Sequence, residues 1–172
     1  MHIKILYNTD KIKDQLPFIE SQKDFLEKNG MFFYFPFDLK KDNFAKQIEE
    51  DKKRFEVKHI EEILNKEINK KEALIFKYLK EYNSNIGLFE FVDEYTCFLS
   101  FYGCYGYYNF PNEIFVSVCA EPDFIFETII HELIHLLIYK KTKEKSHQEI
   151  ESIVDSVFIK SDLKKIFPNY KA

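Results

Sequence analysis

The alternation of apolar and polar residues predicts three elements at the start of the chain. Met1 to Tyr7 alternates the two types, as a half-buried strand does. Lys11 to Lys28 places apolar residues at helical spacing and is followed by Asn29-Gly30, which is typical of a helix end. Met31 to Phe37 is an aromatic run of strand length, and Pro36 restricts it to a sheet edge because proline has no N–H to donate.

A long amphipathic region follows. Neither proline nor glycine interrupts Asp38 to Ile86, and apolar residues recur in it at spacings of three and four, as on one face of a helix. These positions are Phe44, Ile48, Phe55, Ile60, Ile63, Leu64, Ile68, Leu74, Ile75, Tyr78, Leu79 and Tyr82. We expect two helices that break near Asn65 to Lys70, each with one packed face and one solvated face rather than a partner-binding coil.

Four further elements are predicted in the second half. Tyr95 to Tyr102 and Glu113 to Cys119 are β-branched and aromatic runs of strand length, and the segment between them, Gly103 to Asn112, is rich in turn-forming residues. Residues 124–138 are apolar nearly all round, which is typical of a buried helix. Residues 146–149 form a capping-box sequence, so a second helix begins there.

The buried helix contains a candidate metal site. In His131-Glu132-Leu133-Ile134-His135 the two histidines are four residues apart, so their side chains share one helix face with Cβ atoms about 5 to 6 Å apart. Two imidazoles at this spacing can bind one zinc ion, and the carboxylate between them can act on a water molecule at the metal. Metal binding also accounts for three polar side chains in an apolar helix, which would otherwise lack partners.

A catalytic zinc site needs a third protein ligand and an open fourth position. At 100° per residue, His147 and Glu151 both lie at the border of the apolar face of the second helix, and Asp155 lies one turn beyond Glu151. Residue pattern alone leaves both His147 and Glu151 as candidate third ligands.

The pattern of His131-Glu132-x-x-His135 followed by Glu151-x-x-x-Asp155 resembles the gluzincin family of zinc metallopeptidases over about the last 75 residues. The resemblance implies three ligands for Zn²⁺, which are His131, His135 and Glu151. It also implies that Glu132 is the general base and that Asp155 orients His131, which favours Glu151 over His147. The metzincin pattern does not fit, because residues 136–139 contain neither glycine nor histidine.

This resemblance implies an α+β, zincin-like fold: a small mixed or antiparallel sheet, an active-site helix and a C-terminal ligand helix. Residues 1–85 would form a mostly helical N-terminal region packed as part of the same domain, and residues 86–172 the metallopeptidase core. Glu113 to Cys119 is the expected edge strand that pairs with an extended substrate. Four tyrosines are candidates to line the cleft and to stabilise an oxyanion, namely Tyr102, Tyr105, Tyr107 and Tyr108.

The expected function is zinc-dependent hydrolysis of peptide bonds in a peptide or protein substrate. One alternative is a non-catalytic zinc-binding interaction domain, in which His147 would join the other ligands and close the site. Another alternative is an open zinc site that hydrolyses a different amide or an ester. The number of protein ligands distinguishes the first alternative, and substrate profiling distinguishes the second.

Composition narrows the remaining possibilities. The 172 residues have a net charge of −4, so the chain lacks the basic character of nucleic-acid-binding domains. Three cysteines without C-x-x-C spacing predict reduced thiols, which suits a cytoplasmic protein. The N-terminus lacks the apolar core of a signal peptide, and no stretch is long enough to span a membrane.

Overall fold

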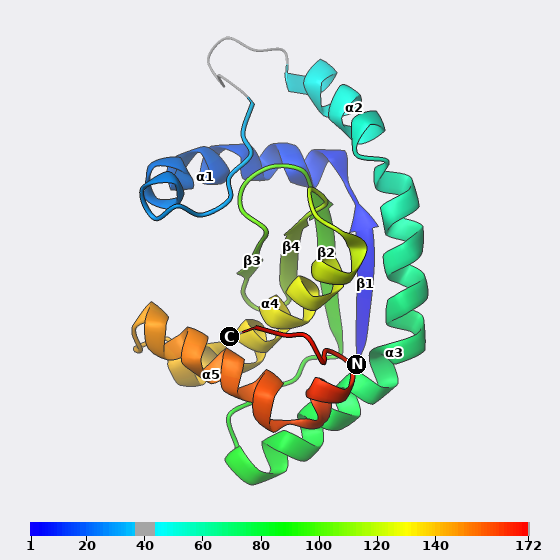
Figure 1. Ribbon diagram of the computed structural model, residues 1–172. Helices are drawn as coiled ribbons and strands as arrows, with labels where there is room; N and C mark the ends of the chain where they lie inside the picture. The colour runs from blue at the N-terminus through cyan, green and yellow to red at the C-terminus, as the bar shows by residue number, and fades with distance from the viewer. Residues whose placement is uncertain (37–43, 172) are drawn as a thin grey trace.

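The computed structural model describes residues 1–36 and 44–171, and over these ranges the chain is mixed α+β, as the sequence predicts. Its elements in chain order are β1 (His2–Tyr7), α1 (Thr9–Lys28), α2 (Phe44–Arg54), α3 (Val57–Ile86), β2 (Glu94–Ser100), β3 (Gly106–Asn109), β4 (Glu113–Ser117), α4 (Pro122–Thr142), α5 (His147–Lys160) and the short 3₁₀ helix η1 (Asp162–Lys165). Figure 1 shows the four strands at the centre of the molecule with helices around them.

The sheet has the strand order β1-β2-β4-β3. Strands β1, β2 and β4 are parallel to one another, and β3 pairs antiparallel with β4. One row across the sheet runs through Ile5, Cys97, Ile114 and Tyr108, which are register partners. Tyr108 stacks on His135 of α4. Because side chains alternate between the two faces of a strand, this row defines the sheet face on which α4 packs.

The opposite face of the sheet is aromatic and lies against α1. Phe98, Phe115 and Tyr107 stack in sequence across β2, β4 and β3, with ring centroids 5.3 Å and 4.7 Å apart. Helix α1 covers this row, since Lys11 Nζ lies 5.3 Å from the Phe98 ring and the Phe18 ring lies 5.5 Å from that of Tyr107. The sheet is therefore buried between α1 and α4, which fixes α4 to a rigid support.

The two edges of the sheet are β1 and β3, and side chains of α3 bond the backbone of β1. Along β1, the backbone N–H of Ile3 donates to Glu72 Oε1 at 2.6 Å, and Asn65 Nδ2 donates to the carbonyl of Ile5 at 3.2 Å. Both side chains come from α3, which runs along this edge (Figure 1) and satisfies backbone groups that a neighbouring strand would otherwise bind. The other edge is β3.

The prediction that Glu113 to Cys119 forms the edge strand is wrong. Strand β4 pairs with β2 on one side and β3 on the other, so it is internal. The true edge, β3, lies inside the segment Gly103 to Asn112 that was predicted to be a turn. Only four residues of that segment are extended, and the glycine, proline and asparagine around them hide so short a strand.

The predicted break near Asn65 to Lys70 is also wrong, because these residues lie within α3. The helical region breaks instead at Phe55 and Glu56, where Glu56 has a positive φ of 47°. Apolar residues keep helical spacing up to the half-buried Phe55. The next apolar residue, the buried Val57, is only two positions after Phe55. A step of two shifts the apolar face by about 200° on a continuous helix, so two helices are needed to bury both faces.

No strand forms over the described part of Met31 to Phe37, contrary to the prediction. Tyr34 makes an isolated bridge with Gly103, through backbone hydrogen bonds of 3.0 and 2.8 Å. Its neighbours are held by ring contacts instead, such as the stacking of Phe32 on Tyr105 at 4.4 Å. Phe37 and the start of the region Asp38 to Ile86 lie outside the described residues.

Other expectations are confirmed. The first strand and first helix form, and Asn8 caps α1 by accepting a hydrogen bond from Lys11 N–H. The capping box of Ser146 and Glu149 is present at the start of α5. The three cysteines are free. In the part of the chain that the structure describes, none of the helices combines the length and the apolar character needed to cross a membrane.

Candidate metal centre

Helix α4 places both motif histidines toward the centre of the molecule. Pro122 stands at its first position, where a proline costs no hydrogen bond, and residues 129–138 are buried except His131, whose side chain is 24% exposed. The side chain of His135 is 5% exposed. The two rings lie one turn apart, with their Nε2 atoms separated by 3.1 Å. The helix thus presents two nitrogen atoms to one point in space.

Helix α5 supplies the third group of the cluster. It packs on α4, where the buried Phe158 lies beside the His131 ring, and Glu151 lies close to the two histidines. Glu151 Oε2 lies 3.3 Å from His131 Nε2, and Glu151 Oε1 lies 3.2 Å from His135 Nε2. His131, His135 and Glu151 are therefore a group that could hold a metal ion.

The ligand atoms of this cluster are close enough to share one metal ion. The two imidazole nitrogens are 3.1 Å apart, and each lies 3.2 to 3.3 Å from a different oxygen of Glu151. One ligand atom from each residue lies within 4.8 Å of the others. Two imidazoles and one carboxylate are also a donor set that catalytic zinc sites use.

The ionised form of Glu151 and the protonated form of His131 stabilise each other. Burial opposes ionisation of Glu151, but hydrogen bonds from His131 and His135 outweigh it and hold the pKa of Glu151 well below its usual range. Burial likewise favours a neutral His131, but its hydrogen bond with Glu151 and the nearby Glu132 carboxylate raise the pKa of His131 above its ordinary value.

Glu132 projects from α4 toward the edge strand. Glu132 is 8% exposed. Burial raises the pKa of its carboxyl, although the nearby His135 and His131 lower it. A Cβ atom built at Gly106 of β3 would lie 2.8 Å from Glu132 Oε1 and 2.6 Å from Thr128 Cγ2. The contact requires glycine at position 106, because any side chain there would displace the Glu132 carboxylate.

A cleft of about 410 Å³ opens beside the cluster. Its polar wall includes His131, Glu132 and Glu151, which come from α4 and α5. Its apolar wall consists of four exposed or half-exposed side chains from three separate segments, namely Met31, Phe32, Tyr105 and Phe124. Tyr105 links this wall together, since its ring stacks on Phe32 and meets Phe124 edge-on at 5.0 Å.

The rival ligand His147 does not join the cluster. Its side chain is 79% exposed, and its Nδ1 atom lies 3.5 Å from Glu151 Oε1. Asp155 is close to the site but does not bond His131 directly. Instead, the hydroxyl of Tyr170 donates to Asp155 Oδ1 at 2.6 Å and lies 3.2 Å from His131 Nδ1.

The four candidate tyrosines have different surroundings. Tyr105 lines the cleft. Tyr108 stacks on His135 with ring centroids 5.1 Å apart and planes 13° apart, which fixes the plane of that imidazole. The hydroxyl of Tyr102 is buried and donates to Asp51, while Tyr107 lies against α1 on the other face of the sheet. Tyr102 and Tyr107 therefore do not line the cleft, contrary to expectation.

The two histidines are held in different ways. His131 is bonded at both ring nitrogens, by Tyr170 at Nδ1 and by Glu151 at Nε2. His135 bonds Glu151 through Nε2, but its Nδ1 is buried and has no hydrogen-bond partner among the described residues. Stacking on Tyr108 therefore supplies the second constraint on its ring.

Sequence reasoning missed three contributors to this site. Tyr170 follows Pro168-Asn169 with no periodic pattern around it, and only the fold brings it to His131. Phe32 was assigned to a strand, although its ring lines the cleft. Gly106 was assigned to a turn; a lone glycine in a strand-like run of tyrosines is the one signal that a close contact was present.

No protein-family model, curated protein or solved structure matches this chain. Its function must therefore be inferred from its own residues. The features available for that inference are the three-residue cluster, the buried carboxylate of Glu132 and the cleft that borders both.

Proposed function

We propose that this chain is a zinc-dependent metallopeptidase of the gluzincin type. The observation that supports this proposal best is the convergence of His131, His135 and Glu151 beside an open cleft, with one ligand atom from each within 4.8 Å of the others. When bound there, zinc supplies Lewis acidity, which polarises a carbonyl group and lowers the pKa of a coordinated water molecule toward about 7.

Glu132 is the proposed general base. It follows the first ligand directly, lines the same cleft and is buried, so its carboxylate faces the reacting groups with little competing water. The carboxylate accepts a proton from the attacking water and then donates it to the departing amine. Burial raises the pKa of the Glu132 carboxyl, and a carboxylate that holds a proton more readily is a better base.

Strand β3 and the apolar wall are the proposed substrate-binding surfaces. An extended peptide can add to an edge strand through backbone hydrogen bonds, and β3 is the sheet edge beside α4. Phe32, Tyr105 and Phe124 would then contact a bulky apolar side chain next to the cleaved bond. This arrangement favours peptides that carry an aromatic or large aliphatic residue at that position.

The non-catalytic alternative needs a fourth protein ligand. Its candidate, His147, is largely exposed and lies outside the cluster of ligand-bearing side chains among the described residues. An open position toward the cleft is what a hydrolase requires. This supports catalysis over a structural zinc site.

The first test is metal content with two carboxylate variants. Purified protein should contain about one zinc per chain, and Glu132→Gln should keep the metal while slowing cleavage of a peptide library by about 10²- to 10⁴-fold. Glu127→Gln is the matched control, because Glu127 lines the same cleft on α4 outside the ligand cluster. Full activity of Glu132→Gln would refute the proposed base. Zinc binding with no peptide cleavage in the wild-type protein would favour another amide or ester as substrate.

The second test assigns the third ligand. Glu151→Ala should release zinc, and His147→Ala should retain it, because only Glu151 lies within ligand distance of both histidines. Equal zinc retention by the two variants would overturn the ligand assignment. Titration with zinc followed by thermal unfolding measures the affinity of each variant.

A further inference from the structure

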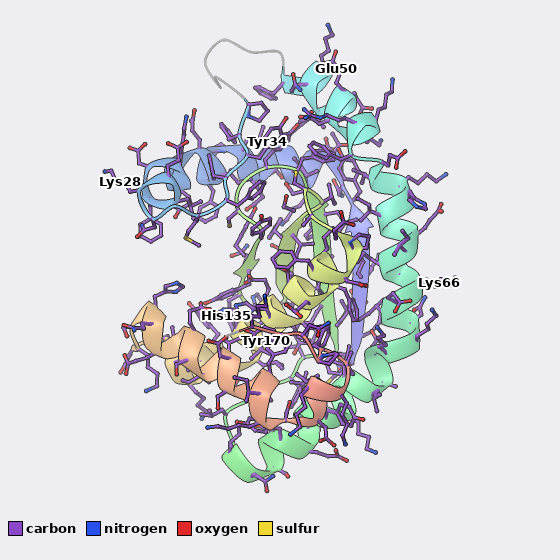
Figure 2. All side chains as sticks on the ribbon, in the orientation of Figure 1. Lys28, Tyr34, Glu50, Lys66, His135 and Tyr170 are labelled. Atoms are coloured by element: carbon purple, nitrogen blue, oxygen red, sulfur yellow. The ribbon has the colours of Figure 1, made fainter. Side chains whose placement is uncertain are left out.

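The segment after η1 returns to the metal centre and brings Tyr170 between α4 and α5. Figure 2 labels Tyr170 and His135 in this region, where the last residues run in front of one end of α4 and alongside α5. The Tyr170 hydroxyl lies 2.6 Å from Asp155 Oδ1 and 3.2 Å from His131 Nδ1. Tyr170 thus connects a carboxylate of α5 to a ligand histidine of α4.

The single proton of this hydroxyl determines the direction of both hydrogen bonds. Asp155 can only accept when it is ionised, so the hydroxyl donates its proton to Asp155. The tyrosine oxygen then has only lone pairs to offer, and His131 must donate from Nδ1–H. A proton at Nδ1 leaves the lone pair of a neutral imidazole at Nε2, which is the atom that faces His135 and Glu151.

The ring of Tyr170 is fixed by the same helix. It stacks on Phe158 with centroids 3.9 Å apart and planes 3° apart, and Phe158 is buried on α5. Asp155, three residues earlier on α5, fixes the hydroxyl end of the tyrosine. The position of the hydroxyl relative to Glu151 is therefore set by one rigid element.

We infer that Tyr170 is a positioning residue, which holds His131 in the orientation and proton state that metal binding requires and which transmits the effect of Asp155 to that ring. This inference rests on the proposed metal site, but not on peptidase activity. The family resemblance implies a direct contact between Asp155 and His131, and in this chain the phenol of Tyr170 stands between the two. Tyr170 also lines the cleft, so zinc affinity, rather than peptide cleavage, is the measurement that isolates its effect on His131.

The test is Tyr170→Phe, which removes the hydroxyl and keeps the ring that stacks on Phe158. Zinc affinity, measured by competition with a chelator, should fall about 10-fold or more, in the range seen when partners of ligand histidines are removed. Tyr107→Phe is the matched control, because Tyr107 is another partly buried tyrosine that stacks on a phenylalanine, and it lies against α1 on the opposite face of the sheet from α4. Its zinc affinity should equal that of the wild-type protein.

A double-mutant cycle tests whether Asp155 acts through Tyr170. Asp155→Ala should weaken zinc binding in the wild-type protein and add little in the Tyr170→Phe background, because the two residues form one relay. Nuclear magnetic resonance of the zinc-loaded protein gives a direct signature: the Nδ1–H proton of His131 should be protected from solvent exchange, and Tyr170→Phe should remove that protection.

The outcomes distinguish failure of the positioning role of Tyr170 from failure of the peptidase proposal. If wild-type protein binds zinc through the three ligands and Tyr170→Phe binds it equally well, the positioning role is refuted while the peptidase proposal stands. Additive losses in the cycle would refute the relay. If wild-type protein binds zinc but cleaves no peptide, the affinity and resonance measurements still test Tyr170 while the proposed function fails.

Discussion

At the scale of single residues, His131, His135 and Glu151 form a cluster that could hold a metal ion, and a metal ion bound there would compete with a proton on His131. The four-residue spacing identified the two histidines, because helical geometry places them on one face, whereas Glu151 was preferred to His147 only through the resemblance to the gluzincin pattern. The spacing did not identify the neighbours that orient them. Tyr170 and Tyr108 reach the histidines through tertiary packing, which leaves no periodic trace in the sequence.

The pH dependence of stability follows from the raised pKa of His131. In metal-free protein, the His131–Glu151 pair stabilises the fold fully below the unfolded value of about 6.5 and loses that effect as pH rises through the raised folded pKa. Zinc must displace the same proton, so its affinity should increase over this window. Calorimetry should show the zinc-induced increase in Tm growing from about pH 6 to pH 8. An increase in Tm that is constant over this range would contradict the competition.

At the scale of elements, the sequence predicted long periodic segments well and short or phase-shifted ones poorly. Helices α4 and α5 were located because one is apolar all round and the other begins with a capping box. Strand β3 was missed because four residues are too few for alternation to appear. The break at Glu56 was missed because glutamate gives no sign of the positive φ that it adopts there.

Gly106 tests the contact between β3 and α4. Gly106→Ala should place a methyl group against Thr128 and Glu132, costing about 1 to 3 kcal/mol of unfolding free energy by overpacking. Peptidase activity should fall while zinc affinity stays, because no ligand is displaced. Thr128→Ser removes the methyl group that approaches most closely and keeps the hydroxyl that donates to the Phe124 carbonyl.

The double variant Gly106→Ala with Thr128→Ser should therefore regain part of the lost stability without regaining activity, since the contact with Glu132 Oε1 remains. Denaturant unfolding and peptide cleavage measure the two effects separately. Wild-type activity in Gly106→Ala would show that the Glu132 carboxylate is not held against β3.

At the scale of the whole molecule, the two halves of the sequence are interleaved. Strand β1 belongs to the first half and pairs with β2 of the second, from His2 opposite Glu94 to Tyr7 opposite Leu99. Helix α3 covers the β1 edge and also packs against α4 and η1. The N-terminal region, expected to be mostly helical, thus supplies one strand of the sheet. This sheet supports α4, the helix that carries His131 and His135.

A fragment of residues 86–172 should therefore fail to fold alone. Without β1 and α3, β2 becomes an unpaired edge, and buried residues such as Cys97 and Leu99 lose their cover. Circular dichroism should show no cooperative thermal transition, and zinc affinity should drop sharply relative to the full chain. Adding a fragment of residues 1–85 should restore part of both. Cooperative unfolding of the isolated 86–172 fragment would contradict this expectation.

The parallel pairing of β1 with β2 also sets an order of events during translation. His2 leaves the ribosome about ninety residues before its partner Glu94, and Glu151 follows later still. Parallel pairing over so long a separation is slow, because the intervening chain must close a loop before any contact rewards it. A metal ion at the proposed site would therefore bind late in the maturation of this protein, after the sheet that supports α4 has formed.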